Sequence, residues 1–225
     1  MKTLVLALVA VTGSVATVIA QEGLTYAGGS MMFSSQQSPK FGNVGPSFPR
    51  AGVGGTAIGL AGGVGRFLVP AISIGFEFSM PNRVESVQDV DYFTSYRRDN
   101  RHRDLILSAL VGFTAHQSGN THLTLVAGPS FVREDTLQRT ASRLAPGFPF
   151  TGDFGPYGPE TQLTRWTKGI ACGLDVPVDV SRHVSIVPDV RMHWISRTDE
   201  RGSQSGRLGL SSFVIRPGVS VRARF

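Results

Sequence analysis

The chain contains a single cysteine, Cys172, among its 225 residues. One thiol excludes a disulfide scaffold and a zinc site built from cysteines. Charged residues make up only 17% of the chain, well below the usual share of about a quarter. The 27 glycines and 13 prolines are too many for a helix bundle, and the length fits a single domain.

Long apolar runs are absent except at the N-terminus. There, Lys2 precedes an apolar stretch over residues 4–11, and small residues continue to Ala20 before the chain turns polar. This order predicts a secretory signal peptide over residues 1–20 and a mature chain over residues 21–225. A transmembrane anchor is the alternative, but polar residues interrupt the stretch, which is marginal in length for a membrane-spanning helix.

The formal net charge is +6, which suits either nucleic acid or anionic lipid. Because the chain is predicted to be exported, we expect no nucleic-acid partner. No second apolar run of about 18 residues exists. The exported chain is therefore either soluble or a membrane-spanning β-barrel, since backbone groups within lipid must be paired internally.

The C-terminal segment alternates strictly between apolar and polar residues. From Phe213 to Phe225 every second residue is apolar or proline, and the interleaved positions include Arg216, Arg222 and Arg224. This period of two predicts a β-strand, longer than the usual five or six residues or so of a globular strand. Five further segments repeat the pattern, and two glycine-rich ones complete a set of eight; they lie near residues 23–34, 51–63, 72–80, 104–113, 122–131, 165–176 and 184–194.

The connections between these segments alternate in length. Short ones are expected near residues 64–69, 116–120 and 177–182, and longer ones near residues 35–50, 81–102, 135–163 and 197–206. Such alternation is typical of bacterial outer-membrane barrels, with short periplasmic turns and long external loops. The sequence therefore predicts an all-β fold, an eight-stranded antiparallel up-and-down transmembrane β-barrel over residues 21–225.

A soluble sandwich or lipocalin-like barrel is the alternative fold, because the same alternation would serve it. The signal peptide, the strand length and the terminal Phe225 favour the membrane barrel. Pro129, Pro188 and Pro217 fall inside predicted central strands, which counts against their boundaries because proline lacks a ladder donor.

The free-energy cost of placing a charged side chain in lipid decides which strand face points outward. An arginine on the lipid face at the midplane costs about 2–4 kcal/mol. The charged face must line the lumen, where opposite charges have to share the space. The predicted lumen ion-pair cluster comprises Glu77, Asp104, Asp175, Asp189, Arg165, Arg191, Arg216, Arg222 and Arg224, with Asp189 expected close to Arg216. We interpret it as a polar plug, because eight strands leave little open diameter. An arginine-lined passage for anions is the alternative.

Aromatic girdles are expected where the strands meet the membrane surfaces. Trp166 and Trp194 fall at the predicted outer ends of their strands, and Phe225 falls at the inner end.

Enzyme motifs are missing from the sequence. No HExxH or GxSxG is present, nor a GxGxxG followed by a helix. The one tempting group is His193 with Ser185, Ser196 or Asp189, which we interpret as lumen residues. We therefore expect no catalytic residue, no metal and no cofactor.

The long connection over residues 81–103 carries a basic and aromatic set. It comprises Tyr92, Phe93, Tyr96, Arg97, Arg98, Arg101 and Arg103. Such a patch on the external surface could bind the phosphates of lipopolysaccharide or another anionic partner. A solvated loop with ordinary charge is the alternative.

The final strand, with its alternating apolar residues and terminal Phe225, resembles that of the small outer-membrane β-barrel proteins of Gram-negative bacteria, the OmpA/OmpX/OmpW-like group. The segment from Gly65 to Glu77 also looks like a turn and strand of that group. The resemblance covers the whole mature chain by pattern, not by motif. It implies a location in the outer membrane, contact with its lipid and lipopolysaccharide, and recognition of the C-terminal strand by the barrel assembly machinery. It carries no catalytic residues.

From these observations we expect a monomer with a structural or surface-interaction role through its external loops. A narrow, porin-like channel or carrier for small solutes is the alternative. A lipid-modifying enzyme is the third possibility.

Overall fold

The computed structural model describes residues 23–36, 55–91, 95–143, 153–196 and 212–225. The expected signal peptide over residues 1–20 lies outside them. The described residues form ten strands: β1 (Thr25–Gln36), β2 (Gly55–Val69), β3 (Ile72–Pro81), β4 (Val84–Asp91), β5 (Ser95–Ser118), β6 (Thr121–Ser142), β7 (Thr161–Asp175), β8 (Val178–Asp179), β9 (Val184–Ile195) and β10 (Phe213–Arg224). None of the described residues belongs to a helix long and apolar enough to cross a membrane.

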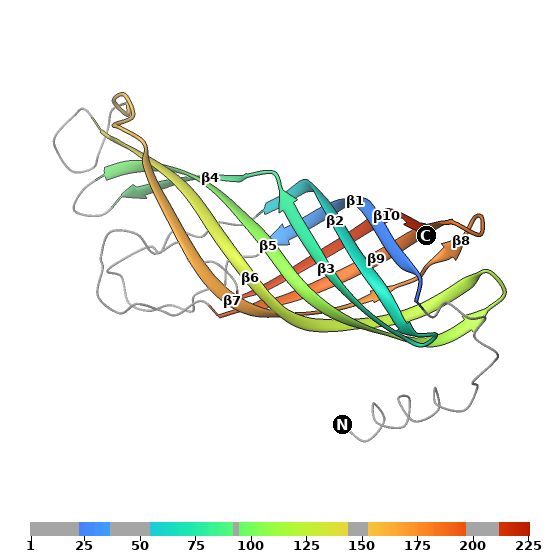
Figure 1. The fold of residues 1–225 in the computed structure, drawn as a ribbon. Helices are drawn as coiled ribbons and strands as arrows, with labels where there is room; N and C mark the ends of the chain where they lie inside the picture. Colours follow the sequence, from blue (N-terminus) through green and yellow to red (C-terminus); the bar gives the residue numbers. More distant parts are fainter. Residues whose placement is uncertain (1–22, 37–54, 92–94, 144–152, 197–211) are drawn as a thin grey trace, which may run out of the picture.

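Eight of these strands close into an antiparallel barrel (Figure 1). The ring runs β5-β3-β2-β1-β10-β9-β7-β6 and closes through the pairing of β5 with β6. The two short strands are continuations: β4 follows β3 and pairs with β5, and β8 follows β7 and pairs with β9. The predicted eight-stranded antiparallel barrel is therefore confirmed.

Two prolines break the strand ladder without ending the strands. The pairing of β5 with β6 skips from Ser108–Ser130 to Val111–Ala127, on either side of Pro129. The pairing of β1 with β10 is interrupted in the same way around Pro217. Because proline has no N–H to donate, each ladder opens locally on one side while the other side stays paired.

Three expected connections are wrong, because strands run through them. β2 continues to Val69, so the turn comes at Pro70 and Ala71 and not over residues 64–69. β4 and the start of β5 occupy most of residues 81–102, and β6 runs on to Ser142 within the expected loop 135–163. Over residues 81–102 and 135–142 both strand faces are rich in polar residues, so hydrophobic alternation gives no signal there.

These additional strand residues form a sheet that projects beyond the ring (Figure 1, left). The ring ends at this side where β3 stops pairing with β5 at Ser79–Ile106 and β7 stops pairing with β9 at Gly169–Ile195. We call the sheet the external wall, and define it as β4 with residues 95–105 of β5, residues 133–142 of β6 and residues 161–168 of β7. The other end of the barrel carries the short turns and the C-terminus.

Alternation sorts the side chains of the ring into two sets. The outward set is apolar and exposed, as at Phe76 on β3, Ile170 on β7 and Val219 on β10. The inward set is buried and mixed, with charged residues beside small and aliphatic ones. Apolar side chains on the outside and charged ones inside reverse the arrangement of a soluble barrel and are typical of a barrel in lipid.

Candidate functional site

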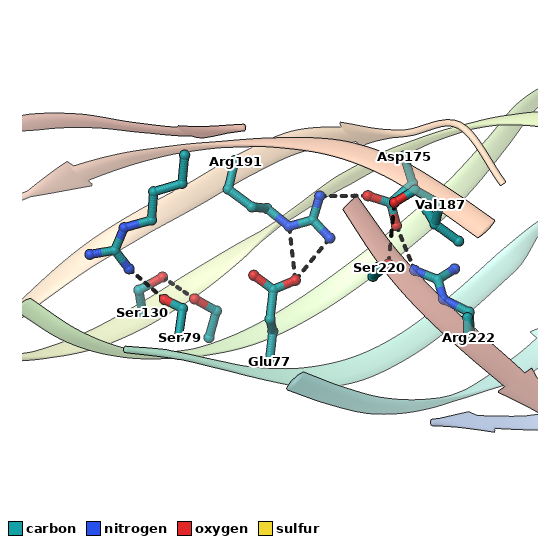
Figure 2. A network of polar contacts seen from close by, with 10 residues as sticks. Glu77, Ser79, Ser130, Asp175, Val187, Arg191, Ser220 and Arg222 are labelled. Carbon is teal, nitrogen blue, oxygen red and sulfur yellow. Dashed lines mark hydrogen bonds and ion pairs between the residues drawn. The ribbon is translucent and has the colours of Figure 1, made fainter. Parts of the chain in front are cut away.

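A network of ion pairs crosses the lumen (Figure 2). The Arg191 guanidinium on β9 lies with Nε 2.9 Å and Nη2 2.8 Å from Glu77 Oε2 on β3. Its Nη1 also donates to Asp175 on β7, whose second oxygen accepts from Arg222 Nη2 on β10 at 2.8 Å. Four strands on opposite sides of the ring are thus joined by charged side chains that all occupy inward positions.

Glycines on β2 and β3 make room for the end of this network. The Arg222 guanidinium stacks over the Tyr26 ring, 4.6 Å from its centroid. A Cβ on Gly65 would overlap that ring, and a Cβ on Gly75 would lie 2.8 Å from its hydroxyl oxygen. The bulky Tyr26 side chain can therefore lie across the wall only because these two inward positions lack side chains.

Arg216 lies deeper in the lumen and is only 1% exposed. Its Nε donates to Ser34 Oγ at 3.3 Å, its Nη1 donates to Ser79 Oγ, and its Nη2 donates to the carbonyl oxygen of Asp104 at 3.2 Å. These partners come from β1, β3 and β5, so one guanidinium spans the width of the barrel. Such a side chain blocks the lumen at its own level.

The expected register between β9 and β10 is off by two residues. Arg216 lies opposite Arg191, and Asp189 lies opposite Gly218. The period of two determines which face a residue occupies, but not its level, because the connection between the strands leaves the pairing free to shift.

An apolar cluster closes the lumen on the external side of Arg216. It consists of Ile106, Val132, Ile195 and Val214, each 0–1% exposed. On the other side of Arg216 lies a cavity of about 60 Å³ that Asp189, Arg191 and Arg222 line. Water molecules fit such a volume, but the buried guanidinium and the apolar cluster separate it from the external side.

The remaining members of the predicted lumen cluster lie elsewhere. Arg224 pairs with Asp179 at the mouth of the barrel opposite the external wall, with 2.6 Å between Nη2 and Oδ1. Arg165 lies on the external wall, beyond the point where β9 stops pairing with β7, so its assignment to the ring's lumen is wrong. The reason is the length of β7, which extends past the ring. Asp104 stays beside the lumen network, because its carbonyl oxygen accepts from Arg216, while its carboxylate contacts His102 of its own strand.

Asp179 ties several elements together at that mouth. His122 Nε2 lies 3.0 Å from its Oδ2, and Ser185 Oγ donates to its Oδ1 at 2.8 Å. Burial raises the pKa of the Asp179 carboxyl, but hydrogen bonds from His122, Ser185 and Arg224 outweigh burial and hold the pKa below its usual range.

The structure reveals a buried polar chain that sequence reasoning missed. His102 Nε2 lies 2.7 Å from Asp104 Oδ1, and His102 Nδ1 lies 2.9 Å from Thr136 Oγ1. These are the residue types of a hydroxyl–imidazole–carboxylate relay, yet all three side chains are buried and none lines the cavity beside Arg216. The signal was the spacing of His102 and Asp104, which lie two residues apart and so share a face of one strand. His102 falls at the end of an expected loop, and only Asp104 falls in an expected strand.

The candidate catalytic group around His193 does not assemble. Neither ring nitrogen of His193 has a hydrogen-bond partner in the described part of the chain. Ser185 donates to Asp179 instead, and the Ser196 backbone N–H donates to the Lys168 carbonyl. Among the described residues, no group of three or more His, Cys, Asp or Glu side chains is suited to a metal ion.

The expected basic and aromatic loop is part of a strand where the structure describes it. Tyr92 and Phe93 lie outside the described residues, whereas Tyr96, Arg97, Arg98 and Arg101 belong to β5. Arg98 stacks over Tyr96 at 5.3 Å, and Arg101 pairs with Glu85 of β4 at 3.3 Å.

A second aromatic contact fixes the segment before β7 to the wall. The Arg97 and Arg143 guanidinium groups both lie over the Phe154 ring, at 4.4 and 4.7 Å from its centroid. Arg139 lies over the Tyr157 ring at 5.1 Å and pairs with Asp99 at 2.6 Å. The wall is thus braced by contacts between arginines and aromatic rings.

The three residues predicted for aromatic girdles all point outward. Trp166, Trp194 and Phe225 are 60%, 63% and 68% exposed. The backbone of Phe225 exchanges two hydrogen bonds with Thr25, which joins the last residue to the first strand.

Comparisons with known proteins give structures but no family. No family model and no curated protein sequence matches the chain. The attachment invasion locus protein Ail of Yersinia pestis is similar in structure, with a TM-score of 0.51 and 11% identity over 91% of this chain and 99% of that one. The outer membrane protein OprG from Pseudomonas aeruginosa also has a TM-score of 0.51, with 12% identity over 93% of this chain and 99% of that one. The chain therefore has the fold of the small eight-stranded outer-membrane β-barrel proteins.

Proposed function

We propose that this chain is a surface protein of the bacterial outer membrane that acts through contacts made by its external wall, and that its own side chains close its lumen. The closed lumen carries this proposal. Arg216 and the apolar cluster of Ile106, Val132, Ile195 and Val214 are almost completely buried inside the ring, which favours an interaction role over transport.

The outward surface supports the membrane location. Its exposed side chains are apolar along the ring, and the closed ladder leaves no edge of the ring unpaired. A closed barrel is one of the two structures that satisfy all backbone groups within lipid. The fold that the chain shares with Ail and OprG points to the same location.

The external wall supports the interaction role. β5 and β6 are 24 and 22 residues long, about twice what a tilted strand needs to cross the hydrocarbon region. The residues of β5 and β6 beyond that length form a braced sheet and not a set of loose loops. Rigid sheets that project from a scaffold suit recognition, because little conformational entropy is lost on binding.

A narrow channel is the second candidate. The cavity between Asp189, Arg191 and Arg222 supports it, since charged side chains already line part of the lumen. A passage would require Arg216 to leave its three partners and the apolar cluster to separate. A lipid-modifying enzyme has less support, because the hydroxyl–imidazole–carboxylate chain at His102 is buried.

Site-directed labelling in cells tests the location and the direction of the wall. In a Cys172→Ser background, Val87→Cys on β4 and Val180→Cys in the turn after β8 are matched, because the native side chains are 63% and 65% exposed. A maleimide that cannot cross membranes should label V87C in intact cells and V180C only after the outer membrane is permeabilised. The opposite pattern, or equal labelling of both, would contradict the proposal.

A further inference from the structure

Three cations lie on the outward face at the base of the external wall. They are Arg103 on β5, Arg133 on β6 and Lys168 on β7, three strands that are neighbours in the sheet. Arg133 is paired with the exposed Trp166, and Lys168 is paired with the exposed Phe131. Paired residues share a face in an antiparallel sheet, so the cations point outward and not into the lumen.

The register places these cations on one diagonal of the sheet. Asp135 lies opposite Arg103, and Arg133 is two residues away on the same strand. Trp166 lies opposite Arg133, and Lys168 is two residues away. Diagonal neighbours of this kind have their Cβ atoms about 7–8 Å apart, so one phosphate group fits between each adjacent pair of cations.

Asp135 fixes two of the three cations. It is buried between them, with Oδ1 3.2 Å from Arg133 Nε and Oδ2 3.5 Å from Arg103 Nη2, and it also accepts from Thr164 Oγ1 at 3.0 Å. Burial raises the pKa of this carboxyl, but the hydrogen bond from Thr164 and the charge of Arg133 outweigh burial and lower it. The carboxylate therefore stays charged and holds both guanidinium groups in place, and one acid against three cations leaves a surplus of positive charge.

The two fixed arginines keep donors available. Arg103 and Arg133 have side chains 28% and 40% exposed, and Asp135 contacts one nitrogen of each guanidinium. Arg103 Nη1 also lies 3.9 Å from Met80 Sδ, and the five donors of each guanidinium are not all used by these contacts. Guanidinium groups bind phosphate through such donors with charge-assisted hydrogen bonds.

An apolar surface continues directly below the cations. Leu107, Phe131 and Ile170 are exposed on the same face and the same three strands. The three cations thus lie next to an apolar surface on the same face of the sheet. This arrangement matches an amphipathic ligand, whose charged headgroup would contact the cations while its acyl chains contact the apolar side chains. Free anions would use only the first of these two features.

We propose that Arg103, Arg133 and Lys168 bind the headgroup of a lipid that carries two phosphates, in the outer leaflet, with its acyl chains on Leu107, Phe131 and Ile170. This proposal rests on the proposed membrane location and goes beyond it by naming a ligand and its site. It is independent of whether the lumen conducts.

Native mass spectrometry of the refolded mature chain in detergent tests the proposal. The probes are diphosphoryl lipid A, the same lipid with both phosphates removed, and phosphatidylglycerol. The variant is Lys168→Gln, because Lys168 does not contact Asp135 and its loss should leave the barrel folded. The matched control is Arg182→Gln, an exposed cation in the turn at the other end of the barrel. Retained fast migration of unheated protein in a gel shows that each sample is folded.

Wild-type protein and R182Q should both bind diphosphoryl lipid A with one-to-one stoichiometry and at least tenfold more tightly than the other two lipids. K168Q should bind it roughly tenfold more weakly, the effect expected from one charge-assisted hydrogen bond. Equal binding of the dephosphorylated lipid or of phosphatidylglycerol would overturn the proposal, as would an unchanged affinity of K168Q. Displacement of the lipid by millimolar inorganic phosphate would reveal a site for free anions and would also overturn it.

Discussion

Arg191 and Glu77 are 114 residues apart in the sequence, yet two nitrogens of the guanidinium lie within 3 Å of one carboxylate oxygen across the lumen, at 2.9 and 2.8 Å. Asp175 holds the third guanidinium nitrogen. The pairing links β9 to β3 and β7, strands from different sides of the ring.

Arg191→Met should lower the free energy of unfolding by about 3–5 kcal/mol, because it leaves the buried Asp175 and the half-buried Glu77 in the lumen with less positive charge between them. Urea titration in lipid vesicles, followed by tryptophan fluorescence, measures this. Ser220→Ala, which removes one lumen hydrogen bond to the Val187 carbonyl, should cost only about 1 kcal/mol. An R191M variant as stable as S220A would show that the network is not a stabilising feature.

Gly65→Ala should destabilise the barrel by about 1–3 kcal/mol, the usual cost of overpacking, because the new methyl group overlaps the Tyr26 ring. Tyr26→Ala in the same chain should recover part of the loss. Gly29→Ala is the control, since a Cβ there meets only one atom, at 4.0 Å. The temperature at which the protein loses its fast gel migration gives the order of stability. An effect of G29A equal to that of G65A would contradict the explanation.

The Asp179 carboxyl makes the mouth opposite the external wall sensitive to acid. Its pKa in the folded chain lies below the unfolded value, so its contribution is complete above about pH 4 and is lost as the pH falls through the folded value. Asp179→Asn should therefore cost about 1–2 kcal/mol near neutral pH. The difference between wild type and D179N should shrink below about pH 4. A difference that grows in acid would contradict this sign.

Deletion of Phe225 should reduce the amount of barrel assembled in cells several-fold, if the assembly machinery reads the terminal aromatic as the resemblance implies. Purified protein should still refold, since the Phe225 side chain is exposed. Phe213→Ala, an outward phenylalanine at the other end of β10, is the control and should assemble normally. Quantitative blotting of outer-membrane fractions against refolded yield separates the two effects.

Much of the fold could be predicted because each strand of the ring faces lipid on one side and a charged lumen on the other. Apolar and polar side chains therefore alternate strictly along the strand. Residues 213–225 show it most clearly, and β10 occupies all of them except the last in the structure. The external wall could not be predicted in this way. Asp99 and Arg101 on one face of β5 and Asn100 and His102 on the other are all polar, so no period in hydrophobicity remains.

The lumen could be predicted only in part. Alternation identifies Arg191 and Glu77 as inward residues, but it does not tell which strand positions share a level. The level of each residue depends on the register between strands. Between β9 and β10 the register expected from the sequence differs from the observed one by two residues. The hydrogen bonds of Arg216 with β1, β3 and β5 depend on the closed ring as a whole.

The closed lumen is the central claim, and single-channel recording tests it most directly. Refolded mature protein, with folding verified by gel migration, is inserted in a planar lipid bilayer beside an Arg216→Ala variant. We expect no conductance steps from wild type, and none from R216A as long as Ile106, Val132, Ile195 and Val214 stay packed. Discrete steps from wild type, with an ion selectivity that changes in R216A, would contradict the account and identify a channel.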